Sequence, residues 1–92
     1  MIEPEHILDI CCEVFKVNKD IVISEFQDRT YIRPRQAFAL ICHKELQLSH
    51  NEIGIVIGRE KSTIQGYIHK QPKDRFYTER LKVCFEKVGN LS

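Results

Sequence analysis

A helical spacing of apolar residues runs through almost the whole chain, and it leaves little room for any fold that is not all-α. Between residues 5 and 88 the large apolar side chains recur at steps of three and four, interrupted by short polar turns. Amphipathic helices have this period, whereas a half-buried strand alternates at every second residue. A chain of 92 residues holds one domain. We therefore predict a single all-α domain over residues 1–92.

The breaks in the pattern predict five or six helices. They cover residues 5–16, a short turn at 19–24 capped by Asn18, residues 34–46, residues 49–57, a helix from Gly58 to Gln71-Pro72, and residues 73–88 with Gly89 as the C-cap. Residues 25–32 read as a polar loop. Pro34 suits the first turn of a helix, where its missing N–H costs nothing. This assignment places Arg35 and Gln36 in an exposed first turn.

The middle of the chain has the local signals of a helix-turn-helix. Ser49 and Glu52 form the capping-box pattern that starts a helix. Gly58 ends that helix as a left-handed turn residue would, and Gly54 permits a close approach of two helices. A second helix follows at once, with Lys61, Ser62, Gln65 and His69 on its outward face. Two short helices around a tight turn are typical of DNA-binding helix-turn-helix proteins.

The charge distribution supports a nucleic-acid partner. The net charge is only +1. Residues 1–28, however, carry seven acids against two bases, while residues 29–75 carry nine bases against four acids. The basic half contains the predicted helix-turn-helix. Phosphate binding needs a local basic patch and not a basic protein.

Several classes of protein are disfavoured by missing motifs. The sequence has no phosphate-binding glycine loop and no metalloprotease motif, so we expect no enzyme activity, cofactor or small-molecule substrate. Cys11, Cys12, Cys42 and Cys84 lack metal-ligand spacing, so we expect free thiols and no metal. No apolar run approaches the ~18–20 residues of a membrane span. The acidic N-terminus is unlike an export signal, so we expect a cytoplasmic location without membrane attachment.

Three segments at fixed separations carry a resemblance to a known family. They are RPRQ at residues 33–36, SHNEIG at 49–54 and GREKSTI at 58–64. The ordered set resembles the C-terminal DNA-binding domain of the bacterial replication initiator DnaA, whose pattern is R-P-R-Q, then S-L-P-E-I-G, then G-G-R-D-H-[ST]-T-V. The resemblance is strongest over residues 5–71. It implies a Trp-repressor-like helix-turn-helix domain that binds double-stranded DNA, with replication initiation as the process.

The resemblance also assigns roles by position. Glu60, Lys61 and Ser62 stand where the family reads base edges in the major groove, with Thr63 beside them. Arg35, Gln36, His50 and Asn51 stand where the family touches the DNA backbone. Arg59 is expected on a flanking phosphate as part of the basic patch. Gln27 replaces the family's minor-groove arginine, and Arg29 is the candidate to substitute for it from two residues further on.

The departures from the family pattern predict an altered target sequence. One glycine of the Gly-Gly pair before Arg59 is missing, so the turn is shorter. Glu60-Lys61 replaces the family's Asp-His. A carboxylate can accept from cytosine and a lysine can donate to guanine, so base reading stays chemically possible at both positions.

Two other functions remain open on the sequence alone. The acidic N-terminal helix and the depleted basic loop favour a protein-interaction module that keeps the fold without binding DNA. A helix-turn-helix transcription regulator of another family is the other alternative. Protein partners from replication or regulation are compatible with each reading.

Overall fold

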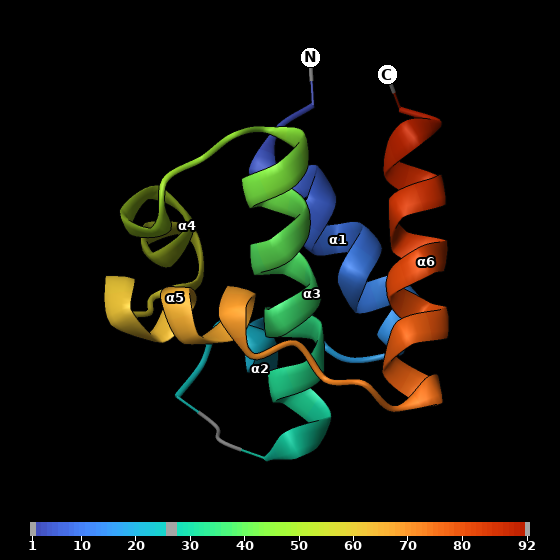
Figure 1. Ribbon diagram of the computed structural model, residues 1–92, viewed down its shortest axis with the longest axis horizontal. Coiled ribbons are helices and arrows are strands. Elements are labelled where there is room, and N and C mark those ends of the chain that lie inside the picture. Colours follow the sequence, from blue (N-terminus) through green and yellow to red (C-terminus); the bar gives the residue numbers. More distant parts are fainter. Residues whose placement is uncertain (1, 26–27, 92) are drawn as a thin grey trace.

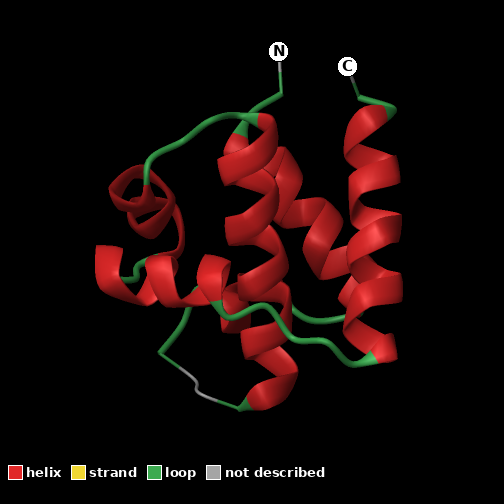
Figure 2. Cartoon of the chain, viewed as in Figure 1, coloured by secondary structure: helices red, strands yellow, loops and turns green. Residues whose placement is uncertain are grey.

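The protein is a helical bundle packed around an apolar core. The computed structural model describes residues 2–25 and 28–91, with only the backbone of Arg29, and these residues contain six helices and no strand (Figures 1 and 2). The helices are α1 (Pro4–Phe15), α2 (Lys19–Val22), α3 (Arg29–Glu45), α4 (His50–Ile57), α5 (Lys61–His69) and α6 (Arg75–Gly89). The all-α prediction is confirmed. Helix α3 packs against each of the other five helices.

Helix α1 forms where the first apolar stripe predicts it. Its start has a reciprocal capping box between Glu3 and His6, with Pro4 in the first turn. Lys16 ends it in the left-handed conformation, with φ of 57°. The stripe of this helix is buried in the core, and its members are Ile7, Leu8, Cys11, Cys12 and Phe15.

The start of α3 differs from the sequence prediction. The loop expected at residues 25–32 is wrong for residues 29–32, because α3 begins at Arg29 and not at Pro34. The Asp28 side chain caps the helix by accepting from the N–H of Thr30 at 2.9 Å. Pro34 therefore lies in the second turn, and it is fully buried. The next residue, Arg35, is fully buried as well.

Helices α4 and α5 form the predicted helix-turn-helix. Ser49 and Glu52 make the expected capping box at the start of α4. Gly58 ends α4 in the left-handed conformation, with φ of 66°. A Cβ added to Gly54 would lie 2.3 Å from the carbonyl oxygen of Arg59. Because real Cβ atoms do not approach a carbonyl so closely, only glycine permits this turn.

Helix α6 closes the bundle beside α1 (Figure 1). The Asp74 side chain caps it by accepting from the N–H of Tyr77 at 3.0 Å. Its buried side chains are Tyr77, Cys84 and Val88, and the Tyr77 ring lies 6.0 Å from the ring of Phe15. Gly89 belongs to the helix, and the C-cap is Asn90 and not the predicted Gly89. None of the helices described is both long and apolar enough to cross a membrane.

All four cysteines lie in the core and are unpaired. Burial raises the pKa of the Cys12 thiol to about 11 and that of the Cys42 thiol to about 12. A thiol reacts as its thiolate, so a raised pKa and poor access both slow the reaction.

We therefore predict that the native thiols are protected. Ellman's reagent at pH 8 should react slowly with the folded protein, because all four thiols are buried. In denaturant without reductant, it should detect four thiols per chain. Fewer than four thiols in denaturant, or rapid reaction of the native protein, would contradict this prediction.

Candidate nucleic-acid interface

The predicted base-reading residues lie together at the start of α5. Glu60 is the N-cap of α5, and Lys61 and Ser62 occupy its first turn. All three side chains are exposed, and Thr63 is half-buried. Ile64 on the opposite side of the helix is fully buried in the core. Helix α5 therefore presents the polar face that its sequence predicts.

The start of α4 lies beside the start of α5. His50 and Asn51, the predicted backbone contacts, line one surface hollow together with Lys61, Ser49 and His43. Asn51 is exposed and His50 is half-exposed. Within the described part of the chain, Lys61 makes no ion pair. The fold thus brings an uncompensated ammonium group next to the first turn of α4.

Arg35 has a different environment from the one predicted. Its side chain has no exposed surface. Its guanidinium donates to three backbone carbonyls at the end of α2: Nε to Val22 at 2.6 Å, and Nη2 to Ile21 at 3.2 Å and to Ser24 at 3.1 Å. The last carbonyls of a helix have no partner within the helix. Arg35, which belongs to α3, is the side-chain donor to the carbonyl of Val22 and a second donor to the other two carbonyls.

The side chain of Arg59, in the turn between α4 and α5, also reaches the end of α2. Its guanidinium donates to the carbonyl of Ser24 and to those of Ile57 and Gly58, the latter two at 3.3 and 3.2 Å. A Cβ on Gly58 would lie 3.8 Å from the carbonyl oxygen of Ile23, so the turn itself lies against the end of α2. Both guanidinium groups thus donate to the carbonyl of Ser24. We use the name arginine clamp for Arg35, Arg59 and this carbonyl.

The arginine clamp places two cations together without a carboxylate. Burial, and next the charge of Arg59, lower the pKa of the Arg35 guanidinium. Nη1 of Arg35 and Nε of Arg59 are buried without a hydrogen-bond partner. The carbonyl oxygens that the clamp holds offset this cost, and the side chain of Tyr67 acts in the same direction by raising the pKa of Arg35.

These contacts correct the expected exposure of Arg35 and Gln36, and they describe the surroundings of Arg59. The exposed position of Arg35 is wrong, and a side chain without exposed surface cannot touch a phosphate. We therefore treat Arg35 as structural and not as a DNA contact. Gln36 is half-buried, its Oε1 is buried, and its carbonyl accepts from Gln71 at 3.3 Å. Arg59 is half-buried, with its guanidinium engaged by the protein.

The expected minor-groove contact falls outside the described structure. Gln27 is among the residues that the structure does not describe, and so is the side chain of Arg29. The backbone of Arg29 begins α3.

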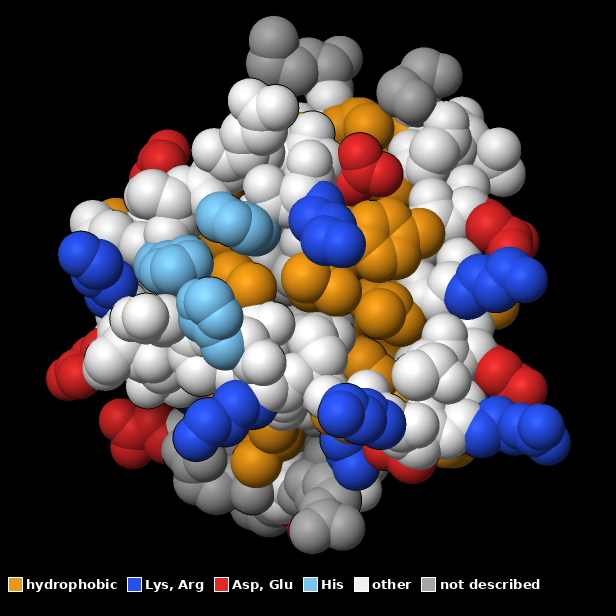
Figure 3. Space-filling model, in the orientation of Figure 1, with side chains coloured by type: hydrophobic (Ala, Val, Ile, Leu, Met, Phe, Trp, Pro, Cys, Tyr) orange, Lys and Arg blue, Asp and Glu red, His pale blue; other side chains and the backbone are white. Residues whose placement is uncertain are grey.

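A cluster of histidines was missed by sequence reasoning. The rings of His43 and His50 lie 5.3 Å apart between centroids, and those of His50 and His69 lie 6.4 Å apart. Figure 3 shows the three rings side by side on one face of the molecule. No spacing in the sequence signals this cluster, because each ring comes from a different helix.

The fold and this face define a helix-turn-helix domain, and comparison with known proteins defines its family. A family model described as "Bacterial dnaA protein helix-turn-helix" matches residues 4–70. The chain belongs to this family. Residues 1–3 and residues 71–92, which contain α6, lie outside the match.

Relatives with the initiator's name share the same region. The chain is 33% identical over 61 residues to "Chromosomal replication initiator protein DnaA 1" of Chlamydia trachomatis serovar D, and 31% identical to the protein of that name in Chlamydia muridarum. Each match covers 66% of this chain and 13% of the relative. The chain therefore corresponds to a small part of those proteins.

The arginine clamp predicts that a substitution at Arg35 strongly lowers stability, although the sequence alone suggests an exposed polar position there. Arg35→Ala should lower the free energy of unfolding by about 2–4 kcal/mol, because it removes a fully buried side chain and takes away the donor to the carbonyl of Val22. Urea denaturation followed by circular dichroism measures this change.

Lys82→Ala is the matched control, since Lys82 is an exposed cation on α6. It should change stability by less than about 0.5 kcal/mol. Equal urea midpoints for the two variants would show that the clamp does not stabilise the fold.

Proposed function

We propose that this domain binds double-stranded DNA by placing the first turn of α5 in the major groove. The observation that carries the proposal is the exposed, unpaired Lys61 at the start of α5, next to the start of α4 in the basic half of the chain. A recognition helix reads base edges with its N-terminal residues, while the preceding helix lies across the backbone. Family membership supports this arrangement.

The proposed roles follow from side-chain chemistry. Lys61 donates to the O6 and N7 acceptors of guanine, and Glu60 accepts from a cytosine amino group. Ser62 hydrogen-bonds at a neighbouring base edge, with Thr63 at the rim. His50 and Asn51 contact phosphate oxygens, which position the domain without reading sequence. Since Glu60 and Lys61 replace the family's Asp-His, the preferred site differs from the family's.

The activity we propose is binding and not catalysis, in the cytoplasm where bacterial DNA lies. We also propose a role in replication initiation and contacts with replication or regulatory proteins. These roles are proposals because the chain covers only 13% of the initiator relatives.

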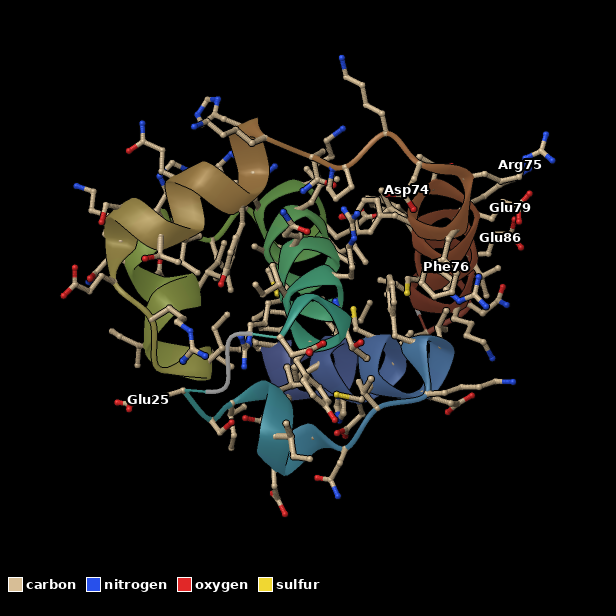
Figure 4. The ribbon with its side chains drawn as sticks, turned by 90° about the horizontal axis from the view of Figure 1, so that it is seen from below. Glu25, Asp74, Arg75, Phe76, Glu79 and Glu86 are labelled. Carbon is tan, nitrogen blue, oxygen red and sulfur yellow. The ribbon has the colours of Figure 1, made fainter. Side chains whose placement is uncertain are left out.

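One observation favours the alternative of a protein-interaction module. Phe76 of α6 is 51% exposed, although the guanidinium carbon of Arg80 lies over its ring, 3.7 Å from the centroid. Phe76 borders a hollow that is also lined by Phe15 and by the Arg33–Asp74 ion pair. In Figure 4, the labelled Phe76, Glu79 and Glu86 lie on the opposite side of the molecule from α4 and α5. Protein contact through α6 would therefore not need the helix-turn-helix.

Duplex binding and its salt dependence separate these functions. Fluorescence anisotropy with a mixed-sequence duplex should show affinity that falls linearly with the logarithm of salt concentration, with a slope of about −0.9 for each phosphate neutralised. Lys61→Ala should weaken binding, whereas Lys82→Ala removes the same charge from α6 and should not. Equal losses for the two variants, or no binding at low salt, would contradict the proposal.

The base contact of Lys61 is tested by site selection on random duplexes. A lysine on a base edge should produce a guanine preference at one position, worth about 1–3 kcal/mol, which Lys61→Ala removes. If the selected site is unchanged and only affinity falls, Lys61 contacts a phosphate and α5 has a different orientation in the groove.

A further inference from the structure

Three histidines gather at the edge of the proposed DNA-binding face. His43 lies in the last turn of α3, His50 begins α4 and His69 ends α5. Their rings are neighbours at centroid distances of 5.3 and 6.4 Å (Figure 3). We call these residues the histidine trio. His43 and His69 are exposed and His50 is half-exposed. The trio is therefore accessible to a ligand and is not part of the core.

One ring of the histidine trio makes a hydrogen bond to the backbone. The Nδ1 atom of His43 lies 3.1 Å from the carbonyl oxygen of Leu48. A carbonyl oxygen can only accept, so this hydrogen bond requires the proton on Nδ1 and leaves Nε2 to take up a second proton. The contact also fixes the ring plane. His43 is thereby oriented before any ligand arrives.

The surroundings of the trio favour an anion and not a metal ion. Among the residues described, no three His, Cys, Asp or Glu side chains are placed to hold a metal ion. Lys61 lines the same hollow as His43 and His50. The nearby carboxylate of Glu52 is engaged at the N–H of Ser49 at 3.0 Å, and that hydrogen bond lowers the pKa of Glu52. Among the described residues that line the hollow are thus one ammonium group and two imidazoles, and no carboxylate.

We propose that the histidine trio is a proton-dependent binding site for the phosphate oxygens of the DNA backbone. This inference rests on the proposed function, since the duplex supplies the phosphates. A neutral imidazole has one N–H donor, whereas an imidazolium has two and a positive charge. Adjacent imidazolium rings beside Lys61 repel one another, and a phosphate placed against them relieves that repulsion. Proton uptake and DNA binding therefore support each other.

The expected result is an affinity that rises as pH falls. Between about pH 8 and pH 6, where histidine side chains ordinarily change charge, the backbone phosphates and the bases keep theirs. Affinity for a duplex should increase roughly fivefold for each imidazole that gains a phosphate partner. The salt slope should steepen by about 0.9 for each of them.

The experiment compares two variants by anisotropy at constant ionic strength and three pH values. One variant is the triple change His43→Gln, His50→Gln and His69→Gln, which should bind with little dependence on pH. The control is His6→Gln, far along the chain at the start of α1. Glutamine at that position can still form the capping box, so the control should keep the full pH dependence.

The outcomes separate this inference from the proposed function. Wild-type binding without pH dependence, or an unchanged pH dependence in the triple variant, overturns the phosphate site while leaving DNA binding intact. Absence of binding at every pH contradicts both proposals. Thermal unfolding of the triple variant confirms that it is folded at each pH, so that a flat profile reports the lost imidazoles.

Discussion

The geometry of this domain depends on two arginines that share one backbone carbonyl. Arg35 from α3 and Arg59 from the helix-turn-helix both donate to the carbonyl of Ser24, just beyond α2. The end of α2 is thereby joined to the central helix on one side and to the turn before α5 on the other. Helix α2 has only four residues, and Arg35 also donates to the carbonyl of Val22, its last residue.

The start of α5 lies close to the same contact. Gly54 allows the backbone of Arg59 to pass directly over α4, and the N–H of Arg59 donates to the carbonyl of Gly54 at 2.8 Å. The side chain of Arg59 then extends to Ser24. The turn is one glycine shorter than the family pattern. Hydrogen bonds from both the backbone N–H and the side chain of Arg59 hold it in place. The specificity proposed for Lys61 depends on this fixed starting point.

The sequence predicted the elements well where local signals act alone. The apolar period located α1, and the caps at Asn18 and Ser49 located the starts of α2 and α4, because each signal involves atoms within three residues. The start of α3 was wrong because Pro34 is a stronger signal in the sequence than Asp28. In the structure, the Asp28 cap begins the helix and the proline is accommodated in its second turn.

The site was predictable only for residues that face solvent. Lys61 and Ser62 follow from the helical period, since Ile64 must face the core. Arg35 has the spacing of a core residue relative to Phe38, but a charged side chain is ordinarily exposed, and its carbonyl partners lie in another helix. The histidine trio is equally a product of tertiary structure. Such long-range contacts leave no mark in local spacing.

The most direct test of the central claim is a nuclear magnetic resonance titration of the domain with a duplex. If α4 and α5 form the DNA-binding face, the largest amide shifts should fall at residues 50–51 and 60–63, and residues 76–88 of α6 should change little. Shifts centred on α6, with the starts of α4 and α5 unaffected, would contradict the account and indicate that this face of the helix-turn-helix is not the one that binds.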